Sequence, residues 1–259
     1  MKILFIGDIV GSPGREAIKT LVPPLKQELG IDFVIANAEN ASGGSGITAK
    51  VATELFASGA DVLTSGDHIW KKPEIFELIN QEERILRPLN FPSGAPGRGA
   101  NVFKARNGVK VGVININGRV FMDALECPFK AALKAAGELA EETKIIIVDI
   151  HAEATSEKIA LGWYLDGKVS AIFGTHTHIQ TADEKILPQG TAYITDVGMT
   201  GPYDSVIGRR VEDVLTRFLS SIPVRFQVAE GNIQLHGALV EIDQATGKAL
   251  SILRIQRKI

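Results

Sequence analysis

The chain has 259 residues, 45% of them hydrophobic and 22% charged, and a formal net charge of −2. A chain of this size and composition buries a full core in one large α/β domain, here residues 1–259, and its balanced charge excludes a strong nucleic-acid-binding surface. The single cysteine, Cys127, excludes an internal disulfide. No apolar run reaches the ~18–20 residues that span a bilayer. Together these features favour a cytoplasmic protein without a membrane contact.

The first third of the chain alternates between strand and helix patterns. Strands are predicted at 3–6, 33–36 and 61–64, and helices from about residue 15, at 48–56 and at 73–80. Thr48 is a suitable N-cap for the second helix, and Pro73 suits the first turn of the third. We expect the first helix to be disturbed at Pro23-Pro24, because proline lacks the N–H that the helix needs.

The rest of the chain has a mixed character. Asn107-Gly108 between two extended runs is a strong signal for a hairpin with a two-residue turn. The predicted elements are hairpin strands at 101–104 and 109–115, a helix at 129–142, and strands at 145–150, 169–173, 191–195, 224–228, 233–242 and 249–256. A βαβαβ segment followed by mixed or antiparallel strands predicts an α/β fold with mixed sheets inside and helices outside.

Side chains that bind metals follow five of the predicted strands. They are Asp8, Glu39, Asp67, His151, His176 and His178. Crossover connections bring the carboxyl ends of parallel strands to one sheet edge, so we expect these side chains to converge. In His176-Thr177-His178, an extended backbone would present both imidazoles on one side. Each residue alone could be a turn cap, a solvated carboxylate or a core histidine, but their joint placement favours a site. Only His236, inside a predicted strand, is expected to be structural.

Three carboxylates and three imidazoles exceed what one ion needs. Two metal ions bridged by one carboxylate would use all six side chains and relieve the repulsion among the carboxylates. Nitrogen and oxygen ligands without a thiolate favour manganese, iron or zinc over magnesium or calcium. Such a pair activates water and neutralises charge at a phosphorus centre, so the sequence predicts the hydrolysis of a phosphate ester.

The same motifs resemble those of a known family, the calcineurin-like metallophosphoesterases, and more closely those of its bacterial YmdB-like subgroup. The resemblance covers almost the whole chain and is carried by residues 7–15, 37–40, 151–158 and 195–202. It implies a four-layer αββα sandwich with two divalent or trivalent transition-metal ions, iron or manganese, with zinc as an alternative. It also implies a phosphodiesterase whose small substrate is a 2′,3′-cyclic nucleotide.

The resemblance further implies a role for each predicted ligand. One ion would be held by Asp8 and His178, the other by Asp67, His151 and His176, and Glu39 would bridge them. Asn40, directly after Glu39, would be a ligand or would donate a hydrogen bond to the substrate's oxyanion.

The chain departs from the wider family pattern at Val10, where that family often has a histidine, at Glu39, which replaces the usual aspartate, and most sharply at Asp67. The family's Gly-Asn-His is here Gly66-Asp67-His68, and Asp67 carries a charge that asparagine lacks. We hypothesise that Asp67 tightens metal binding but lowers the Lewis acidity of the ion, which would slow hydrolysis or change the metal preference. Adjacent residues at a strand end cannot both point at one ion, so His68 is free to protonate the leaving oxygen or to hold the phosphate. Its alternative role is a hydrogen bond that positions the loop.

Two further segments are candidates for substrate contacts. Glycines 43, 44 and 46 predict a mobile loop whose backbone can approach a phosphate. Thr200 and Gly201, which follow the predicted strand that ends at Asp196, either line the pocket or form a plain turn into Pro202.

A non-catalytic or weakly catalytic regulator that binds a nucleotide or a protein on the same metal scaffold is the alternative function. The complete ligand set and His68 favour the enzyme, because a binding protein needs no general acid. No group of aromatic residues suited to base stacking stands out in the sequence, so nucleotide selectivity rests on the resemblance. A homo-oligomer is compatible with the sequence.

Overall fold

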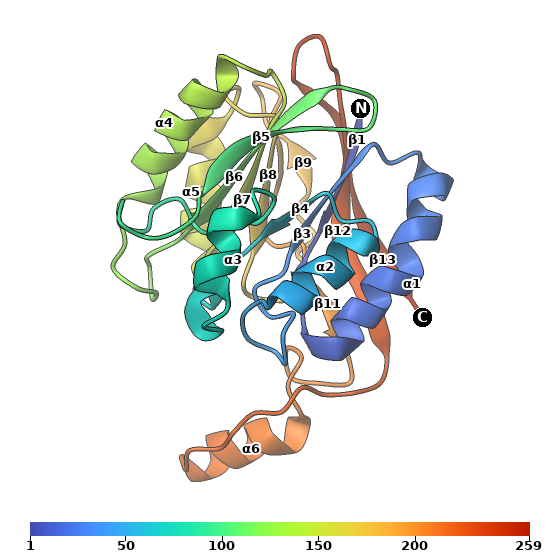
Figure 1. The fold of residues 1–259 in the computed structure, drawn as a ribbon, viewed down its shortest axis with the longest axis vertical. Coiled ribbons are helices and arrows are strands. Elements are labelled where there is room, and N and C mark those ends of the chain that lie inside the picture. Colours follow the sequence, from blue (N-terminus) through green and yellow to red (C-terminus); the bar gives the residue numbers. More distant parts are fainter.

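Thirteen strands form two mixed β-sheets at the centre of the molecule, and the computed structural model describes all of residues 1–259 (Figure 1). The first sheet has the order β2 (Asp8–Ile9), β11 (Met199–Pro202), β12 (Ile233–Ile242), β1 (Lys2–Ile6), β3 (Phe33–Asn37), β4 (Val62–Thr64), and β13 (Ala249–Lys258) pairs with β12. The second has the order β5 (Ala100–Lys104), β6 (Lys110–Asn117), β7 (Ile146–His151), β8 (Ala171–Thr175), β10 (Ala192–Ile194), β9 (Lys185–Ile186).

Helices cover the outer face of each sheet. The first sheet packs against α1 (Gly11–Leu29), α2 (Ala49–Ala57) and α3 (Ile75–Gln81), and the second against α4 (Pro128–Ala140) and α5 (Thr155–Leu165). The predicted four-layer αββα sandwich is therefore confirmed. The last helix, α6 (Val211–Ser220), projects from the end of the sandwich (Figure 1).

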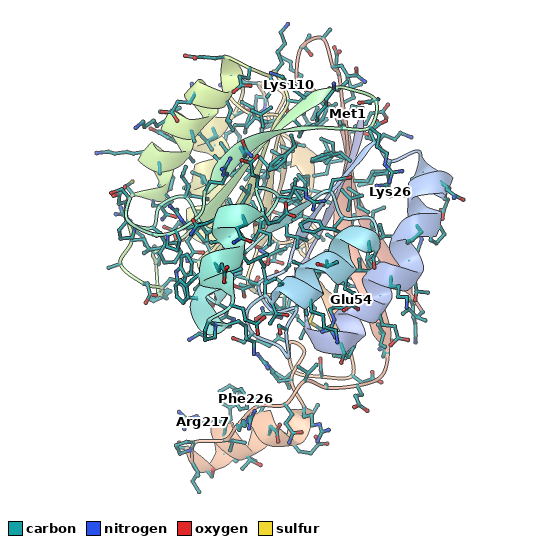
Figure 2. The ribbon with its side chains drawn as sticks, viewed as in Figure 1. Met1, Lys26, Glu54, Lys110, Arg217 and Phe226 are labelled. Atoms are coloured by element: carbon teal, nitrogen blue, oxygen red, sulfur yellow. The ribbon has the colours of Figure 1, made fainter.

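The parallel strands β1, β3 and β4 of the first sheet are apolar on both faces because both faces are covered. In β1, Leu4 and Ile6 pack toward the helices, whereas Ile3 and Phe5 point toward the second sheet, as the alternation of a strand requires. Phe5 stacks on Phe173 of β8 with ring centroids 4.7 Å apart. Side chains fill the space between the sheets (Figure 2), which explains why the strands read as continuous apolar runs rather than alternating ones.

Two local predictions were wrong. Helix α1 begins at Gly11 and continues through Pro23 and Pro24, which lie on its exposed face. The carbonyl groups that lose their helical hydrogen bond there belong to exposed residues and are solvated, so the helix tolerates both prolines. In the predicted hairpin, Gly108 donates to the carbonyl of Ala105 and has a φ of 84°, so the turn is longer than two residues.

Further differences lie in the second half of the chain. Helices α5 and α6 and the short strands β2, β9 and β11 were not predicted, and the strand predicted at 224–228 is absent. That segment instead runs back along α6 to the start of the helix, where Val228 makes a single bridge to Arg209. Thr200 and Gly201 belong to strand β11, so the alternative of a plain turn was also wrong.

None of the helices is both long enough and apolar enough to cross a membrane.

Candidate metal centre

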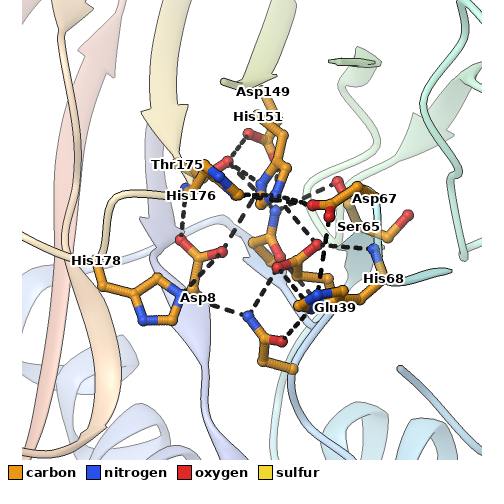
Figure 3. A network of polar contacts seen from close by, with 12 residues as sticks. Asp8, Glu39, Ser65, Asp67, His68, Asp149, His151, Thr175, His176 and His178 are labelled. Atoms are coloured by element: carbon orange, nitrogen blue, oxygen red, sulfur yellow. Dashed lines mark hydrogen bonds and ion pairs between the residues drawn. The ribbon is translucent and has the colours of Figure 1, made fainter. Parts of the chain in front are cut away.

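The carboxyl ends of strands from both sheets bring the six predicted ligand side chains together (Figure 3). Asp8 begins β2, Glu39 follows β3, Asp67 follows β4, His151 ends β7, and His176 and His178 follow β8. Their donor atoms form two groups, in each of which all atoms lie within 4.8 Å of one another. The first group is Glu39, Asp67, His151 and His176, and the second is Asp8, Glu39 and His178. Glu39 is the one residue that belongs to both.

The first group surrounds Nε2 of His151. This nitrogen lies 3.1 Å from Oε2 of Glu39 and 3.2 Å from Oδ1 of Asp67. Nδ1 of His176 lies 3.0 Å from the same nitrogen. Two imidazole nitrogens and two carboxylate oxygens thus point at one small volume, which is the donor set of a transition-metal site.

The second group contains a buried carboxylate oxygen without a hydrogen-bond partner. Asp8 is fully buried, and no donor reaches its Oδ1. Nε2 of His178 lies 3.9 Å from this oxygen, and Nδ2 of Asn40 lies 3.3 Å from Nε2 of His178. An unpaired buried carboxylate oxygen is costly, and a cation between Asp8, Glu39 and His178 would satisfy it. The residues present therefore fit a metal ion at this position as well.

A hydrogen-bond relay behind His151 fixes the orientation of its ring. The hydroxyl of Thr175 donates to Oδ1 of Asp149 at 2.8 Å, so its oxygen is left to accept from Nδ1–H of His151 at 2.9 Å. Asn37 donates to the other oxygen of Asp149 at 3.0 Å. With its proton held on Nδ1, His151 would offer the Nε2 lone pair to an ion placed between Glu39 and Asp67. Such outer partners orient the histidines of metal sites.

The protein's own charges do not balance in this cluster. Burial opposes charge on His151, but Glu39, Asp67 and Asp8 raise its pKa well above the usual value. Burial also opposes charge on Glu39, yet His151 lowers its pKa to about 2. Burial, with a smaller contribution from the charge of Glu39, raises the pKa of Asp8 to about 7, although His151 acts to lower it. The three carboxylates favour a positive charge on only one imidazole, that of His151, so the cluster carries excess negative charge and attracts a cation.

The two histidines after β8 do not lie on extended backbone, so that prediction was wrong. His176 has a φ of 93° and His178 a φ of 65°, values that side-chain-bearing residues adopt only with strain. The loop is held by the N–H of His176, which donates to Oδ2 of Asp8 at 3.1 Å, and by Nδ1 of His178, which contacts the carbonyl of Ile207 at 3.0 Å. As a result the two imidazoles face different donor groups instead of one.

His68 lies beside the donors and faces the open side of the site. Its Nδ1 lies 2.8 Å from Oδ1 of Asn40, whose Nδ2 donates to Oε1 of Glu39 at 2.7 Å. Nε2 of His68 lies 3.8 Å from Oδ2 of Asp67, and 30% of the side chain is exposed. Since Asn40 uses its amide nitrogen on Glu39, its oxygen accepts from Nδ1 of His68, and the Nε2 side of the ring is left for other contacts.

A cavity of about 540 Å³ opens next to the donor groups. One side is formed by residues of the site, which include Glu39, Asn40, His68, His176 and His178. The other side includes Arg209, Val214 and Phe218, together with Phe226 from the returning segment. Sequence reasoning missed this second wall, because α6 was not predicted and Phe226 was assigned to a strand.

The remaining candidate residues lie apart from the cavity or at its edge. Thr200 is buried in β11, its hydroxyl donates to the carbonyl of His236 at 3.3 Å, and neither it nor Gly201 lines the cavity. We therefore assign them no contact with substrate. The glycine loop approaches the cavity wall, where the carbonyl of Gly44 accepts from the guanidinium of Arg209. Gly44 has a φ of 84°, and a Cβ there would collide with Arg209.

The αββα sandwich, with a cluster of metal-binding side chains at one edge, is a fold of the calcineurin-like metallophosphoesterase type. Within that class, the chain belongs to the family of YmdB-like proteins, whose family model matches residues 4–255.

Its relatives match it over nearly their whole lengths. The chain is 53% identical to the 2′,3′-cyclic-nucleotide 2′-phosphodiesterase of Bacillus subtilis, over 98% of this chain and 96% of that protein. A hypothetical protein from Thermus thermophilus has a crystal structure with a TM-score of 0.92 and 40% identity, covering 100% of this chain and 99% of that one. A novel phosphatase from Mycoplasma pneumoniae has a TM-score of 0.91 and 36% identity, covering 100% and 93%.

Proposed function

We propose that this protein is a metal-dependent phosphodiesterase that opens 2′,3′-cyclic nucleotides to nucleoside 3′-phosphates. The observation that carries the proposal is the position of Glu39, whose carboxylate belongs to both donor groups and so can bridge two ions. The 53% identity to a protein named 2′,3′-cyclic-nucleotide 2′-phosphodiesterase supports the substrate class. The cavity beside the donors has room for a small phosphodiester.

In this proposal the chain holds two transition-metal ions, iron or manganese, with zinc as an alternative. One ion would be held by Asp8, Glu39 and His178, beside which Asn40 lies, and the other by Glu39, Asp67, His151 and His176. When bound, the pair supplies an activated water and neutralises charge on the phosphoryl oxygens. A donor set of imidazole and carboxylate without thiolate supports this choice of metals.

His68 is the general acid of the proposed reaction. A bond forms between the water oxygen and phosphorus as the bond between phosphorus and O2′ breaks, and Nε2 of His68 gives its proton to O2′. The proton that the water loses restores His68 by way of solvent. Asn40 supports this role because its hydrogen bond to Nδ1, at 2.8 Å, fixes the ring of His68, a residue that lines the cavity, and leaves Nε2 without a hydrogen-bond partner. A positioned acid of this kind contributes about 10²–10⁴-fold to the rate.

The test is the hydrolysis of 2′,3′-cyclic AMP by manganese-loaded protein, with the products separated by chromatography. We expect 3′-AMP as the product, loss of turnover after chelation, and recovery when manganese is added back. His68→Asn should lower kcat by about 10²–10⁴-fold at unchanged metal content, whereas His236→Gln, which alters a histidine outside both donor groups, should not. Binding of the nucleotide without turnover would support the regulator instead, and full activity after chelation would contradict the metal-dependent mechanism.

A further inference from the structure

The far wall of the cavity is built by a helix that the sandwich does not need. Helix α6 projects from the end of the two sheets (Figure 1), and only Val214 of its residues is buried. The segment after the helix folds back along it: the N–H of Gln227 donates to Oδ2 of Asp213 at 2.9 Å, and the N–H of Arg210 donates to the carbonyl of Gln227 at 3.0 Å. These contacts place Phe226 next to α6, and Phe226 and Arg217 of this helix, both labelled in Figure 2, line the same cavity.

One face of α6 turns toward the candidate metal centre. Val214 and Phe218 are four residues apart and therefore share a face of the helix, and both line the same cavity as His68 and His176. Phe226 lines it as well. Phe218 is 77% exposed and Phe226 is 40% exposed. Two phenylalanine rings thus stand in water at the open end of a cavity whose closed end holds the metal-binding donors.

We propose that Phe218 and Phe226 form the wall on which the nucleobase of the substrate stacks. This inference rests on the proposed function, because it takes the phosphate to lie at the donor groups. A ligand whose phosphate lies there and whose remaining part fills the cavity reaches the α6 wall, since both ends belong to one cavity of about 540 Å³. Pockets for ligands of this size span about 300–1,000 Å³.

The chemistry of the wall matches a nucleobase better than a plain phosphodiester. Phenylalanine offers an aromatic face and no hydrogen-bonding group, and every nucleobase has a π-face that can stack on it. Stacking of this kind does not distinguish strongly among bases. We therefore expect all four 2′,3′-cyclic nucleotides to be substrates, with the two purines depending most on the wall because their rings are larger.

The test compares two substrates that share the reacting ring but differ in the base. 2′,3′-cyclic AMP carries adenine, whereas glycerol 1,2-cyclic phosphate has the same five-membered phosphodiester ring and no base. Phe218→Ala and Phe226→Ala should each lower kcat/KM for 2′,3′-cyclic AMP by about 5- to 150-fold, mainly through KM. Neither variant should change kcat/KM for glycerol 1,2-cyclic phosphate. Phe218→Tyr, which keeps the aromatic ring, should retain the activity of the parent protein on 2′,3′-cyclic AMP.

The matched control lies on the same helix. Leu219 is 85% exposed but does not line the cavity, so Leu219→Ala should leave both substrates unaffected. A binding measurement gives a second readout: by calorimetry, Phe218→Ala should weaken binding of 3′-AMP and leave binding of glycerol phosphate unchanged.

The possible results separate this inference from the proposed function. Equal losses on both substrates, no loss on 2′,3′-cyclic AMP, or the same loss in Leu219→Ala would overturn the stacking wall while the phosphodiesterase stands. If Phe218→Ala changes the oligomeric mass measured by analytical ultracentrifugation and lowers activity equally on both substrates, α6 forms a contact between copies of the chain. That result would also overturn the stacking wall. If neither substrate is hydrolysed, the proposed phosphodiesterase function is wrong. The stacking wall is then tested by binding alone: it stands if Phe218→Ala weakens binding of 3′-AMP and is overturned if it does not.

Discussion

The ammonium group of Lys158 on α5 lies 2.8 Å from the carboxylate of Asp196, and both side chains are fully buried. Oδ2 of Asp196 also accepts from the N–H and the hydroxyl of Thr177, at 3.1 and 2.6 Å, and Oδ1 accepts from the N–H of Gly198 at 2.8 Å. Thr177 lies between His176 and His178, both of which have left-handed backbone. The buried ion pair therefore holds the strained loop that presents these two imidazoles.

Removing one charge of this pair should destabilise the fold. Asp196→Asn leaves the Lys158 ammonium buried without a carboxylate, and we expect a loss of about 3–5 kcal/mol in the free energy of unfolding, measured in urea. Lys158→Met should cost less, because Asp196 keeps its three donors from Thr177 and Gly198. The control is Glu142→Gln, which breaks the exposed pair between Lys110 and Glu142 and should cost at most about 1 kcal/mol. Equal losses in Asp196→Asn and Glu142→Gln would show that the buried pair does not support the loop.

The relay behind His151 should set metal affinity. Thr175→Val keeps the shape of the side chain but removes the acceptor of Nδ1 of His151 and the donor to Asp149. We expect metal affinity, measured by equilibrium dialysis, to fall by about 10- to 100-fold. Thr191→Val is the matched control, because Thr191 is equally buried and its hydroxyl bonds only to Gly167 and Val169. If both variants bind metal like the parent protein, the relay has no role in orienting His151.

The positions of the metal-binding residues were predictable because their signal is local. An apolar run that ends in Asp8 or His151 identifies both the strand and the residue at its carboxyl end, and parallel strands bring such ends together. The two sheets and their flanking helices follow from the same runs and from the family resemblance. The donors fall into two groups that share Glu39, and the assignment of each residue to an ion stays a prediction.

What could not be predicted depends on contacts between distant segments. The alternating run 224–228 has the pattern of a strand, but no free strand edge receives it, so Phe226 lies at the cavity instead. Lys158 resembles any solvated lysine until Asp196, 38 residues away, is placed beside it. The positive φ values of His176 and His178 arise because Asp8 and Ile207 hold the loop, and no local pattern marks them.

The charge of Asp67 should trade metal affinity against turnover. In the structure its Oδ1 lies 3.2 Å from Nε2 of His151, and an asparagine oxygen could occupy the same place. Asp67→Asn should therefore bind metal more weakly and, at equal metal loading, turn over substrate faster or prefer another metal. Metal content is measured by elemental analysis, and turnover is measured for manganese, iron and zinc in parallel. A variant no faster than the parent protein and with the same metal preference would refute the hypothesis.

His236 is a buried histidine outside the donor groups, as its place inside a strand predicted. It lies in β12, where its Nε2 is 3.1 Å from Oε1 of Gln234 and its ring centroid is 4.4 Å from that of Tyr203. Its Nδ1 is buried and has no partner. Burial lowers the pKa of His236 from 6.5 to about 4, because a proton on Nδ1 would find no acceptor.

This histidine should make the fold sensitive to acid. The unfolded chain takes up the His236 proton near pH 6.5 and the folded chain only near pH 4, so the unfolded state binds more protons between these values. Its contribution to stability is therefore complete above pH 6.5 and is lost as the pH falls toward 4. His236→Gln removes this titration and adds a pH-independent offset from the lost contact with Tyr203. We expect the parent protein to lose stability relative to His236→Gln between pH 7 and pH 4 in urea unfolding, because the other titrating groups cancel in the difference. A difference that stays constant over this range would mean that the folded protein protonates His236 without penalty.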